Sequence, residues 1–407
     1  MKRGDSLLPR LGPERHPITN VHQTTHANIK HQISIRKTNN PGHPRRKDGV
    51  DLDVASEMSR ALEKHIIESL RKGDSQLVFD EIASIFSHPT EVGRPRLEIE
   101  FLGQAHALGP DEYYLRDGNA VAIPKLRLIQ AFAVARQHLR SKLQQARIGG
   151  SDNLSEGGKG VDLPDMRKAT SILLLTDPEH LTAANSRKRM ILQAISGGMH
   201  VGPLFDAERH FVDSLLTSPL HRHSKSPTLW SHRRWLLEQQ RKHAVDVNIS
   251  DDIRHVILPS GERHPRNYYA WSHARWLMMT FAKQDENQVG SKVISDVTAW
   301  CLKHHNDISG WSFLLYLLQR QKTPSDICEA VFKETITLTE SFQWRNDSVW
   351  WFLHALVSNS LVSSEGISVF EIFIGNMFGS EEARGLCDER LLASKWHQLY
   401  WENKRHV

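Results

Sequence analysis

The sequence lacks any apolar run close to the roughly 18 residues that a membrane-spanning helix needs. Its first ten residues, M-K-R-G-D-S-L-L-P-R, also lack the apolar stretch of a secretory signal. Cysteine is scarce, because only Cys301, Cys328 and Cys387 occur, too far apart for a disulfide framework or a cysteine-rich zinc site. This usage is typical of a reducing compartment. We therefore expect a cytoplasmic chain with no membrane span.

Motifs that hold metals or phosphates are also missing. The chain has 24 histidines, yet neither H-E-x-x-H nor C-x-x-C occurs. The glycine-rich segment 149–160 does not match a phosphate-binding loop, because Lys159 is followed by Gly160 rather than by serine or threonine. We interpret this segment as a flexible loop, and we predict that the chain itself binds no metal and no cofactor.

The positive charge is concentrated at the beginning of the chain. Residues 1–50 hold ten Lys or Arg against three acids, or +7, whereas the whole chain carries +5. Residues 51–407 are therefore close to neutral. The first 50 residues are rich in proline and polar residues and show almost no apolar periodicity, which predicts a disordered basic tail. Nucleic-acid binding through this tail remains an alternative, but the near-neutral remainder argues against it.

Residues 51–148 are predicted to be a mostly helical N-terminal region. Apolar residues from Leu52 to Leu70 follow helical spacing, and Pro124 is well placed to begin a long helix that runs to about Ala146. The alternating residues Leu97, Ile99 and Phe101 indicate either a strand or an extended arm. The pattern leaves open whether this region extends the array that follows it or forms a separate cap.

A repeat of about 40 residues dominates the rest of the chain. Alignment on one position matches Ala184, Trp230, Trp271, Trp311 and Trp350, with steps of 46, 41, 40 and 39 residues. Such spacing is typical of stacked helical hairpins. We predict an all-α fold, an α-solenoid crescent of five hairpins over residues 161–360, with a C-terminal helical cap over residues 361–407.

Each unit has a first helix, a polar turn and a second helix that carries the tryptophan. The first helix of the third unit looks shortened, to Ile253 to Leu258. In the second unit Trp230, Arg234 and Leu237 share one helical stripe. A large aromatic residue at one repeated position is expected to fill the space between consecutive hairpins, and the arginines beside it are expected to pair with polar groups of the neighbouring hairpin.

Two segments, S-P-T-L-W-S-H-R-R-W-L-L at 226–237 and N-Y-Y-A-W-S-H-A-R-W-L at 267–277, carry a family resemblance. They closely resemble the repeat of protein prenyltransferase alpha subunits. A weaker resemblance, on Asp80-Glu81-Ile82 and on T-A-A-N-S-R-K-R-M-I-L at 182–192, indicates the divergent alpha-type subunit of a type III protein geranylgeranyltransferase. The repeat-signature residues, to which we assign a structural role, are Trp230, His232, Arg233, Arg234, Asn267, Trp271, His273, Arg275, Trp311 and Trp350.

The resemblance implies an alpha-type subunit that wraps around an α/α-barrel beta subunit. In that family the beta subunit holds the catalytic zinc and the prenyl diphosphate, and the acceptor is a cysteine of a protein substrate. The alpha chain lends a cation and a tyrosine to the diphosphate, and Arg266 and Tyr268 occupy those positions here. On the opposing interpretation Arg266 is a solvated turn residue and Tyr268 packs beneath Trp271.

The chain also departs from the family pattern. Ala184 replaces the first tryptophan, Ala274 replaces an arginine, and the arginine pairs of the last two units are lost at Leu314-Leu315 and Leu353-His354. These losses predict a remodelled inner surface, so the resemblance does not carry over the substrate. An alternative function is a non-catalytic helical scaffold that binds a protein or a peptide.

Overall fold

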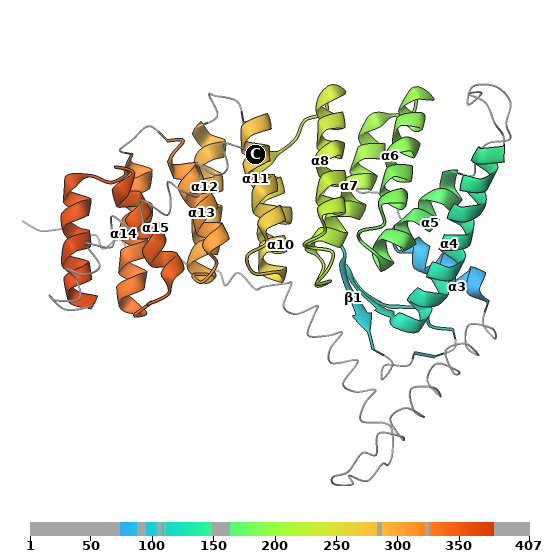
Figure 1. Cartoon of the computed structure of the whole chain (residues 1–407), viewed down its shortest axis with the longest axis horizontal. Helices are drawn as coiled ribbons and strands as arrows, with labels where there is room; N and C mark the ends of the chain where they lie inside the picture. Colours follow the sequence, from blue (N-terminus) through green and yellow to red (C-terminus); the bar gives the residue numbers. More distant parts are fainter. Residues whose placement is uncertain are drawn as a thin grey trace, which may run out of the picture.

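The computed structural model of the chain describes residues 74–87, 95–103, 108–109, 111–148, 163–282, 287–321 and 325–377. The predicted tail 1–50, the predicted helix from Leu52 to Leu70, the loop 149–160 and residues 378–407 of the predicted cap lie outside these residues. Helices dominate the described part, so the predicted all-α repeat fold is confirmed (Figure 1). None of the described helices is long and apolar enough to cross a membrane.

Five helical hairpins stand side by side in an elongated row (Figure 1). Residues 364–377 form one more helix at the far end of the row. The helices of the hairpins are, in order, α5 (Leu163–Thr176) with α6 (Leu181–Ser196), α7 (Val201–Thr217) with α8 (Pro227–Lys242), α9 to α10 (Ile249–Asp252, η1 Ile253–Ile257, Leu258–Arg263) with α11 (Tyr268–Phe281), α12 (Asn287–Lys303) with α13 (Ile308–Leu318), and α14 (Asp326–Ser341) with α15 (Asp347–Ser358).

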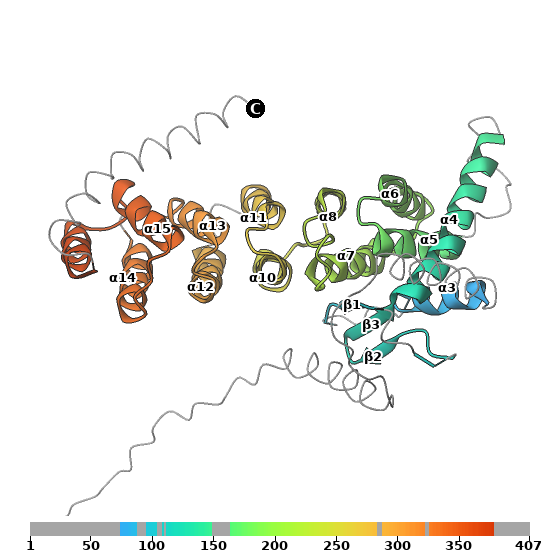
Figure 2. The same ribbon diagram turned by 60° about the horizontal axis from the view of Figure 1, so that its bottom comes forward.

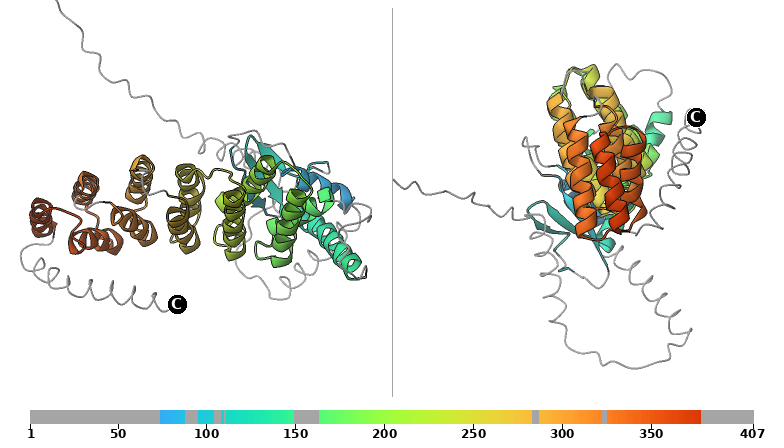
Figure 3. Two further views of the ribbon diagram at one scale, coloured as in Figure 1. Left: turned by 90° about the horizontal axis from the view of Figure 1, so that it is seen from above. Right: turned by 90° about the vertical axis from the view of Figure 1, so that its left-hand side faces the viewer.

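The hairpins build two layers. Helices α7, α10, α12 and α14 form one layer, and α6, α8, α11, α13 and α15 form the other (Figure 2). Viewed along the row, the helices of successive hairpins overlap (Figure 3). One cluster of buried hydrophobic residues continues through all five hairpins, from Val78 to Met377.

Polar residues begin the second helices. The side chains of Ser226, Asn267 and Asp307 each accept a hydrogen bond from a backbone N–H in the first turn of the following helix. Such caps satisfy amide groups that have no partner within the helix. They also place each aligned tryptophan four residues after the cap, which explains why the tryptophan spacing locates the hairpins.

The first helix of the third unit is longer than the sequence suggests. Instead of Ile253 to Leu258, it runs without a break from Ile249 to Arg263 through a π-helical segment, in which the amide of Leu258 donates to the carbonyl of Ile253. Pro259 has no amide hydrogen, and in the sequence it indicates the end of a helix. It is the second residue of α10, immediately beyond the π-helical segment and Leu258, where a missing donor is tolerated.

The N-terminal part combines helices with a small sheet. Between α3 (Ser75–Ser84) and α4 (Lys125–Ile148) lie β1 (Glu98–Leu102), β2 (Leu115–Asp117) and β3 (Ala120–Pro124), in the order β1-β3-β2. The strand interpretation of Leu97 to Phe101 is therefore the right one. Strands β2 and β3 lie in a region that the sequence predicts to be mostly helical, and they pair antiparallel across a tight turn in which Gly118 has φ +58°.

The sheet joins the array through the edge of β1. The amides of Leu97 and Ile99 donate to the hydroxyls of Ser214 in α7 and of Ser218, the residue that follows α7, each at 2.9 Å. The Ser218 hydroxyl also lies 3.1 Å from the carbonyl oxygen of Leu97. These serines stand one helical turn apart, so they match alternate residues of an extended strand. Of the described part of residues 51–148, the sheet thus contacts α7 of the second hairpin, whereas α3 and α4 pack against α5 of the first hairpin.

Candidate functional site

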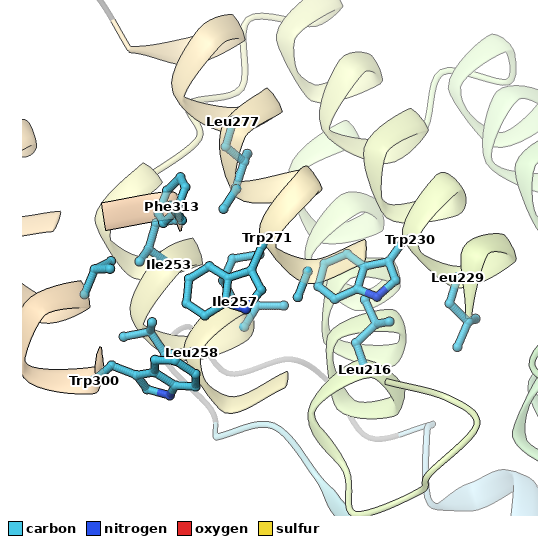
Figure 4. Packing of buried hydrophobic residues seen from close by; sticks show 14 of the residues in the cluster. Leu216, Leu229, Trp230, Ile253, Ile257, Leu258, Trp271, Leu277, Trp300 and Phe313 are labelled. Carbon is cyan, nitrogen blue, oxygen red and sulfur yellow. The ribbon is translucent and has the colours of Figure 1, made fainter. Parts of the chain in front are cut away.

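The aligned tryptophans fill the spaces between hairpins. Figure 4 shows Trp230 and Trp271 in the core, with Trp300 of α12 beside Trp271. The ring of Trp271 lies 5.5 Å from that of Phe313 in α13, and the Trp311 ring lies 4.6 Å from that of Phe352 in α15. Each of these tryptophans contacts the second helix of the next hairpin, which is the structural role that their spacing predicts.

The third unit differs from its neighbours in how the indole is bonded. The indole N–H groups of Trp230, Trp311 and Trp350 each donate to the backbone carbonyl six residues earlier, at 2.9 to 3.0 Å. The buried Nε1 of Trp271 has no hydrogen-bond partner in the described part of the chain. The carbonyl at the equivalent position belongs to Pro265, so the turn before α11 must follow another path.

Arg266 accounts for this different path. Its φ is +56°, in the left-handed region that residues with a side chain rarely adopt. Lys225, Asn306 and Arg345, at the equivalent positions of the other described turns, are not in that region. The amide of Arg266 donates to Oδ2 of Asp307 in the next hairpin at 2.6 Å, which holds the turn in this shape.

Two tyrosines lie next to Arg266 at the surface. Tyr268 is 55% exposed and Tyr269 is 39% exposed, with their rings edge to face at 5.8 Å. Arg266 is exposed as well. Tyr268 therefore does not pack beneath Trp271. The structure brings the two predicted diphosphate-contact residues together on one exposed turn.

Asn267, between them, is fully buried. Its side-chain amide donates to the carbonyl of Ser224 in the preceding hairpin at 2.7 Å, and its side-chain oxygen caps α11 by accepting from Ala270. This side chain therefore anchors the turn while its two neighbours face outward. In the motif N-Y-Y-A-W, the buried Asn267 thus anchors the turn, and Tyr268 and Tyr269 are exposed.

A buried ionic network lies between the first three hairpins, and sequence reasoning did not predict its acids. Glu208 of α7 accepts two hydrogen bonds from Arg187 of α6, each at 2.7 Å, and lies 2.8 Å from Nε2 of His232. Burial alone would raise the pKa of Glu208. The charges and hydrogen bonds of Arg187 and His232 outweigh burial and hold that pKa well below its usual range.

Arg233 is the centre of a second group. It is fully buried and pairs with Asp213 of α7 at 2.7 Å and with Asp252 of α9 at 3.0 Å. Its Nη1 donates to Nε2 of His273 at 2.8 Å. Burial and the charge of Arg233 lower the pKa of His273 well below its usual value, which keeps this ring neutral and able to accept. Arg233 thereby links three helices of two units.

The other two signature arginines are less buried. Arg234, which the sequence stripe aligns with Trp230, has a side chain that is 54% exposed. Arg275 is half-buried, and its Nη2 donates to the hydroxyl of Ser312 in the next hairpin at 2.8 Å. Arg233 and Arg275 therefore bond to polar groups of the neighbouring hairpin. The guanidinium of Arg234 pairs with Glu238 of its own helix and contacts the neighbouring hairpin only by stacking on the ring of Trp276.

The described residues contain no group of three or more His, Cys, Asp or Glu that could hold a metal ion. Cys301 and Cys328 are buried, and burial raises the pKa of each thiol. A raised pKa keeps a thiol protonated and unreactive at neutral pH. Neither cysteine therefore has the properties of a nucleophile.

His223 predicts a pH dependence of stability. It is 3% exposed, and its Nε2 hydrogen-bonds the carbonyls of Leu174 and Leu175 at the end of α5. Burial lowers its pKa from 6.5 to about 4. Since protonation then favours the unfolded chain, this contribution to stability is complete above pH 6.5 and is lost as the pH falls towards 4.

Urea unfolding at about pH 7 and pH 4.5 measures this effect. Between these values we expect the free energy of unfolding to fall by about 2 to 3 kcal/mol because of His223. In His223→Gln the decrease should be smaller by about that amount, since glutamine does not titrate. Equal decreases in both proteins would contradict this assignment.

Two family models match the chain. Residues 206–240 match the protein prenyltransferase alpha subunit repeat, and residues 229–342 match the ECM9 middle domain. No curated protein matches significantly. The first match covers α7 and α8, the hairpin that supplies Glu208, Asp213, His232 and Arg233, and the second covers the turn with Arg266 and Tyr268. The hairpin of α7 and α8 is thus the part of the chain that is similar to the protein prenyltransferase alpha subunit repeat.

Proposed function

We propose that the chain is the alpha-type subunit of a heterodimeric protein prenyltransferase. Its partner would be an α/α-barrel beta subunit that holds the zinc and the prenyl diphosphate, and the product a protein geranylgeranylated on cysteine. Three observations support this proposal: the row of five hairpins, the repeat match at residues 206–240, and the exposed pair Arg266 and Tyr268.

The strained turn is the observation that carries the proposal. A residue with a side chain in the left-handed region costs roughly 1 to 3 kcal/mol, and such strain clusters at functional sites. Ala244, Gln343 and Ser360 share this region, but among the described turns only that of Arg266 carries both an exposed cation and an exposed tyrosine. Asp307 of the fourth hairpin holds this conformation, and Asn267 bonds the turn to Ser224 of the second hairpin.

The chemistry fits the leaving group of prenyl transfer. When a prenyl group moves to a thiolate, negative charge develops on the departing diphosphate. A guanidinium offers two parallel N–H donors to phosphate oxygens, and a phenol hydroxyl adds another donor. Donors that are already in place at the developing charge stabilise the transition state more than the ground state. Arg266 and Tyr268 would supply these donors once the beta subunit is bound.

Co-expression tests the proposal as a whole. We expect the full chain and a cognate beta subunit to form a stable heterodimer that transfers a geranylgeranyl group from its diphosphate to a cysteine-containing acceptor. A persistent monomer without transfer would refute the proposal. A stable complex without transfer would instead favour the non-catalytic scaffold.

Substitution of Arg266 tests the role of the turn. In the heterodimer, Arg266→Ala should lower turnover about 10- to 100-fold, because a charged donor to the leaving group is lost. Arg345→Ala, at the equivalent position of the fifth unit, is the matched control and should leave turnover within about twofold.

Arg266→Gly separates function from folding. Glycine adopts the left-handed region without strain, so this variant should lower turnover equally while the free energy of unfolding stays the same or rises by up to about 1 kcal/mol. If Arg266→Ala and Arg266→Gly both keep full turnover in an intact heterodimer, Arg266 has no role in transfer.

A further inference from the structure

The two layers of the array differ in charge. Apart from the buried Arg187 and Arg233, helices α6, α8 and α11 hold six Lys or Arg and a single acid, Glu238. The opposite layer, formed by α7, α9 to α10, α12 and α14, holds six Lys or Arg and, apart from the buried Glu208, Asp213 and Asp252, eight Asp or Glu. The near-neutral total therefore conceals one basic face, which is formed by neighbouring helices of the second layer (Figure 2).

The cations of this basic face are arranged in a ladder. Lys188 of α6 lies over the ring of Trp235 in α8 at 5.6 Å. One unit further, Arg234 lies over Trp276 of α11 at 4.8 Å. Arg275 then lies over Tyr316 of α13 at 5.9 Å. Each of these contacts joins the same two positions of the repeat. The cation lies four residues after the aligned position of its own unit, and the ring lies five residues after the aligned position of the next unit.

The ladder ends where the repeat signature is lost. The next rung would join Leu315 of α13 to Ala355 of α15, neither of which is charged or aromatic. Arg320, after α13, instead lies over Tyr316 at 5.7 Å. The basic face therefore extends over α6, α8 and α11 and stops at α13, which gives it a defined length of three rungs.

Stacking on an aromatic ring fixes a guanidinium and leaves its edge able to donate hydrogen bonds. Arg234 uses one N–H for Glu238 and its side chain stays 54% exposed, whereas Arg275 is half-buried and donates to Ser312. A stacked guanidinium is ready to pair with a carboxylate at a lower cost in side-chain entropy than a free arginine. Arginine and tryptophan are also the residues that contribute most binding energy at protein interfaces. The ladder thus has the composition of a protein-binding surface with acidic specificity.

Single-stranded nucleic acid fits this face less well. Bases bind by stacking on open aromatic faces. Here Trp276 is only 8% exposed and Arg234 covers its ring, so no open face remains for a base. Carboxylates need only exposed N–H donors. The described helices of the face contain a single acid, Glu238, that competes with a partner's carboxylates for these donors.

We infer that the basic face of α6, α8 and α11 is the surface on which this chain binds a partner protein, and that the partner presents a cluster of carboxylates to Lys188, Arg234 and Arg241. If the proposed function is correct, the partner is the beta subunit. The surface itself follows from charge and stacking alone.

Charge reversal tests this surface in the full chain. The test variant combines Lys188→Glu, Arg234→Glu and Arg241→Glu, three cations of the second layer. The control combines Lys292→Glu, Lys303→Glu and Lys333→Glu, three exposed lysines of α12 and α14 in the opposite layer with the same change of net charge. A second test variant with glutamine at residues 188, 234 and 241 removes the cations without adding acids and serves if the glutamates impair folding.

The measurement is the dissociation constant for the cognate beta subunit at low and at physiological salt. We expect both test variants to weaken binding at least tenfold and to reduce the salt dependence, with the control within about threefold of the unmodified chain. Equal affinities for the test variants and the control would overturn the inference, while the proposed heterodimer would stand.

If the unmodified chain does not bind the beta subunit, the proposed function fails and poly-L-glutamate becomes the probe. Binding of this polymer should be lost in the test variants and retained in the control. Retention in all variants would place the binding elsewhere, on the basic tail, and would overturn the inference.

Discussion

Arg233→Ala should lower the free energy of unfolding by about 3 to 5 kcal/mol, one of the largest effects expected of any single substitution in this chain. The variant removes the fully buried arginine that pairs with both Asp213 and Asp252 and leaves only the partly exposed Arg96 and Arg209 beside them. The pKa of Asp213 lies below its usual value in the folded chain, because Arg233 and two further arginines outweigh the effect of burial. Without Arg233, its ionised form loses the principal compensation. Urea unfolding followed by circular dichroism measures the loss.

Arg234 provides the control for this prediction. It is the next residue in the same helix, but its side chain is 54% exposed and pairs with Glu238 at 3.4 Å. Exposed pairs of this kind contribute at most about 1 kcal/mol. Arg234→Ala should therefore cost less than about 1 kcal/mol. If the two alanine variants differ by less than about 1 kcal/mol, the network around Arg233 does not stabilise the fold as described.

Trp271→Ala is the second large effect, at about 3 to 5 kcal/mol. The side chain is 1% exposed and packs against Trp300 and Phe313, so its removal opens a cavity between the third and fourth hairpins. The surrounding helices cannot close this cavity without shifting a whole hairpin. Guanidinium unfolding should show a lower midpoint, and an unchanged midpoint would contradict the role of Trp271 as the filler of this space.

A pair of phenylalanine variants separates packing from hydrogen bonding at these positions. Trp311→Phe removes the bond from Nε1 to the carbonyl of His305, which is 3.0 Å long. Trp271→Phe removes no such bond, because this Nε1 has no partner in the described structure. We expect Trp311→Phe to cost about 1 kcal/mol more than Trp271→Phe. The reverse order would show that the indole of Trp271 is bonded in solution.

The hairpins could be predicted because each tryptophan follows a polar cap at a constant distance, and both signals are local. The stripe through Trp230, Arg234 and Leu237 was less accurate. The buried side of α8 contains Trp230, Arg233 and Leu237, at positions i, i+3 and i+7. Spacings of three and four residues both suit a helix of 3.6 residues per turn, so periodicity alone could not choose between the two arginines.

The acids of the network could have been noticed. Glu208 lies on the apolar stripe of α7 formed by Phe205, Val212 and Leu215, where a carboxylate requires a buried partner. The partner itself could not be predicted, because Arg187 belongs to another helix and its distance depends on how two hairpins pack. The strands β2 and β3 were missed although Asp117, Gly118 and Asn119 form a recognisable hairpin turn.

The serine contacts at β1 have a consequence for self-association. An open sheet edge can recruit a strand from another molecule, and a row of hairpins with a bare end can stack on a second copy. Here the hydroxyls of Ser214 and Ser218 occupy donors of the β1 edge, and α3 and α4 cover the first hairpin by packing against α5. Both features protect the chain against association through these surfaces.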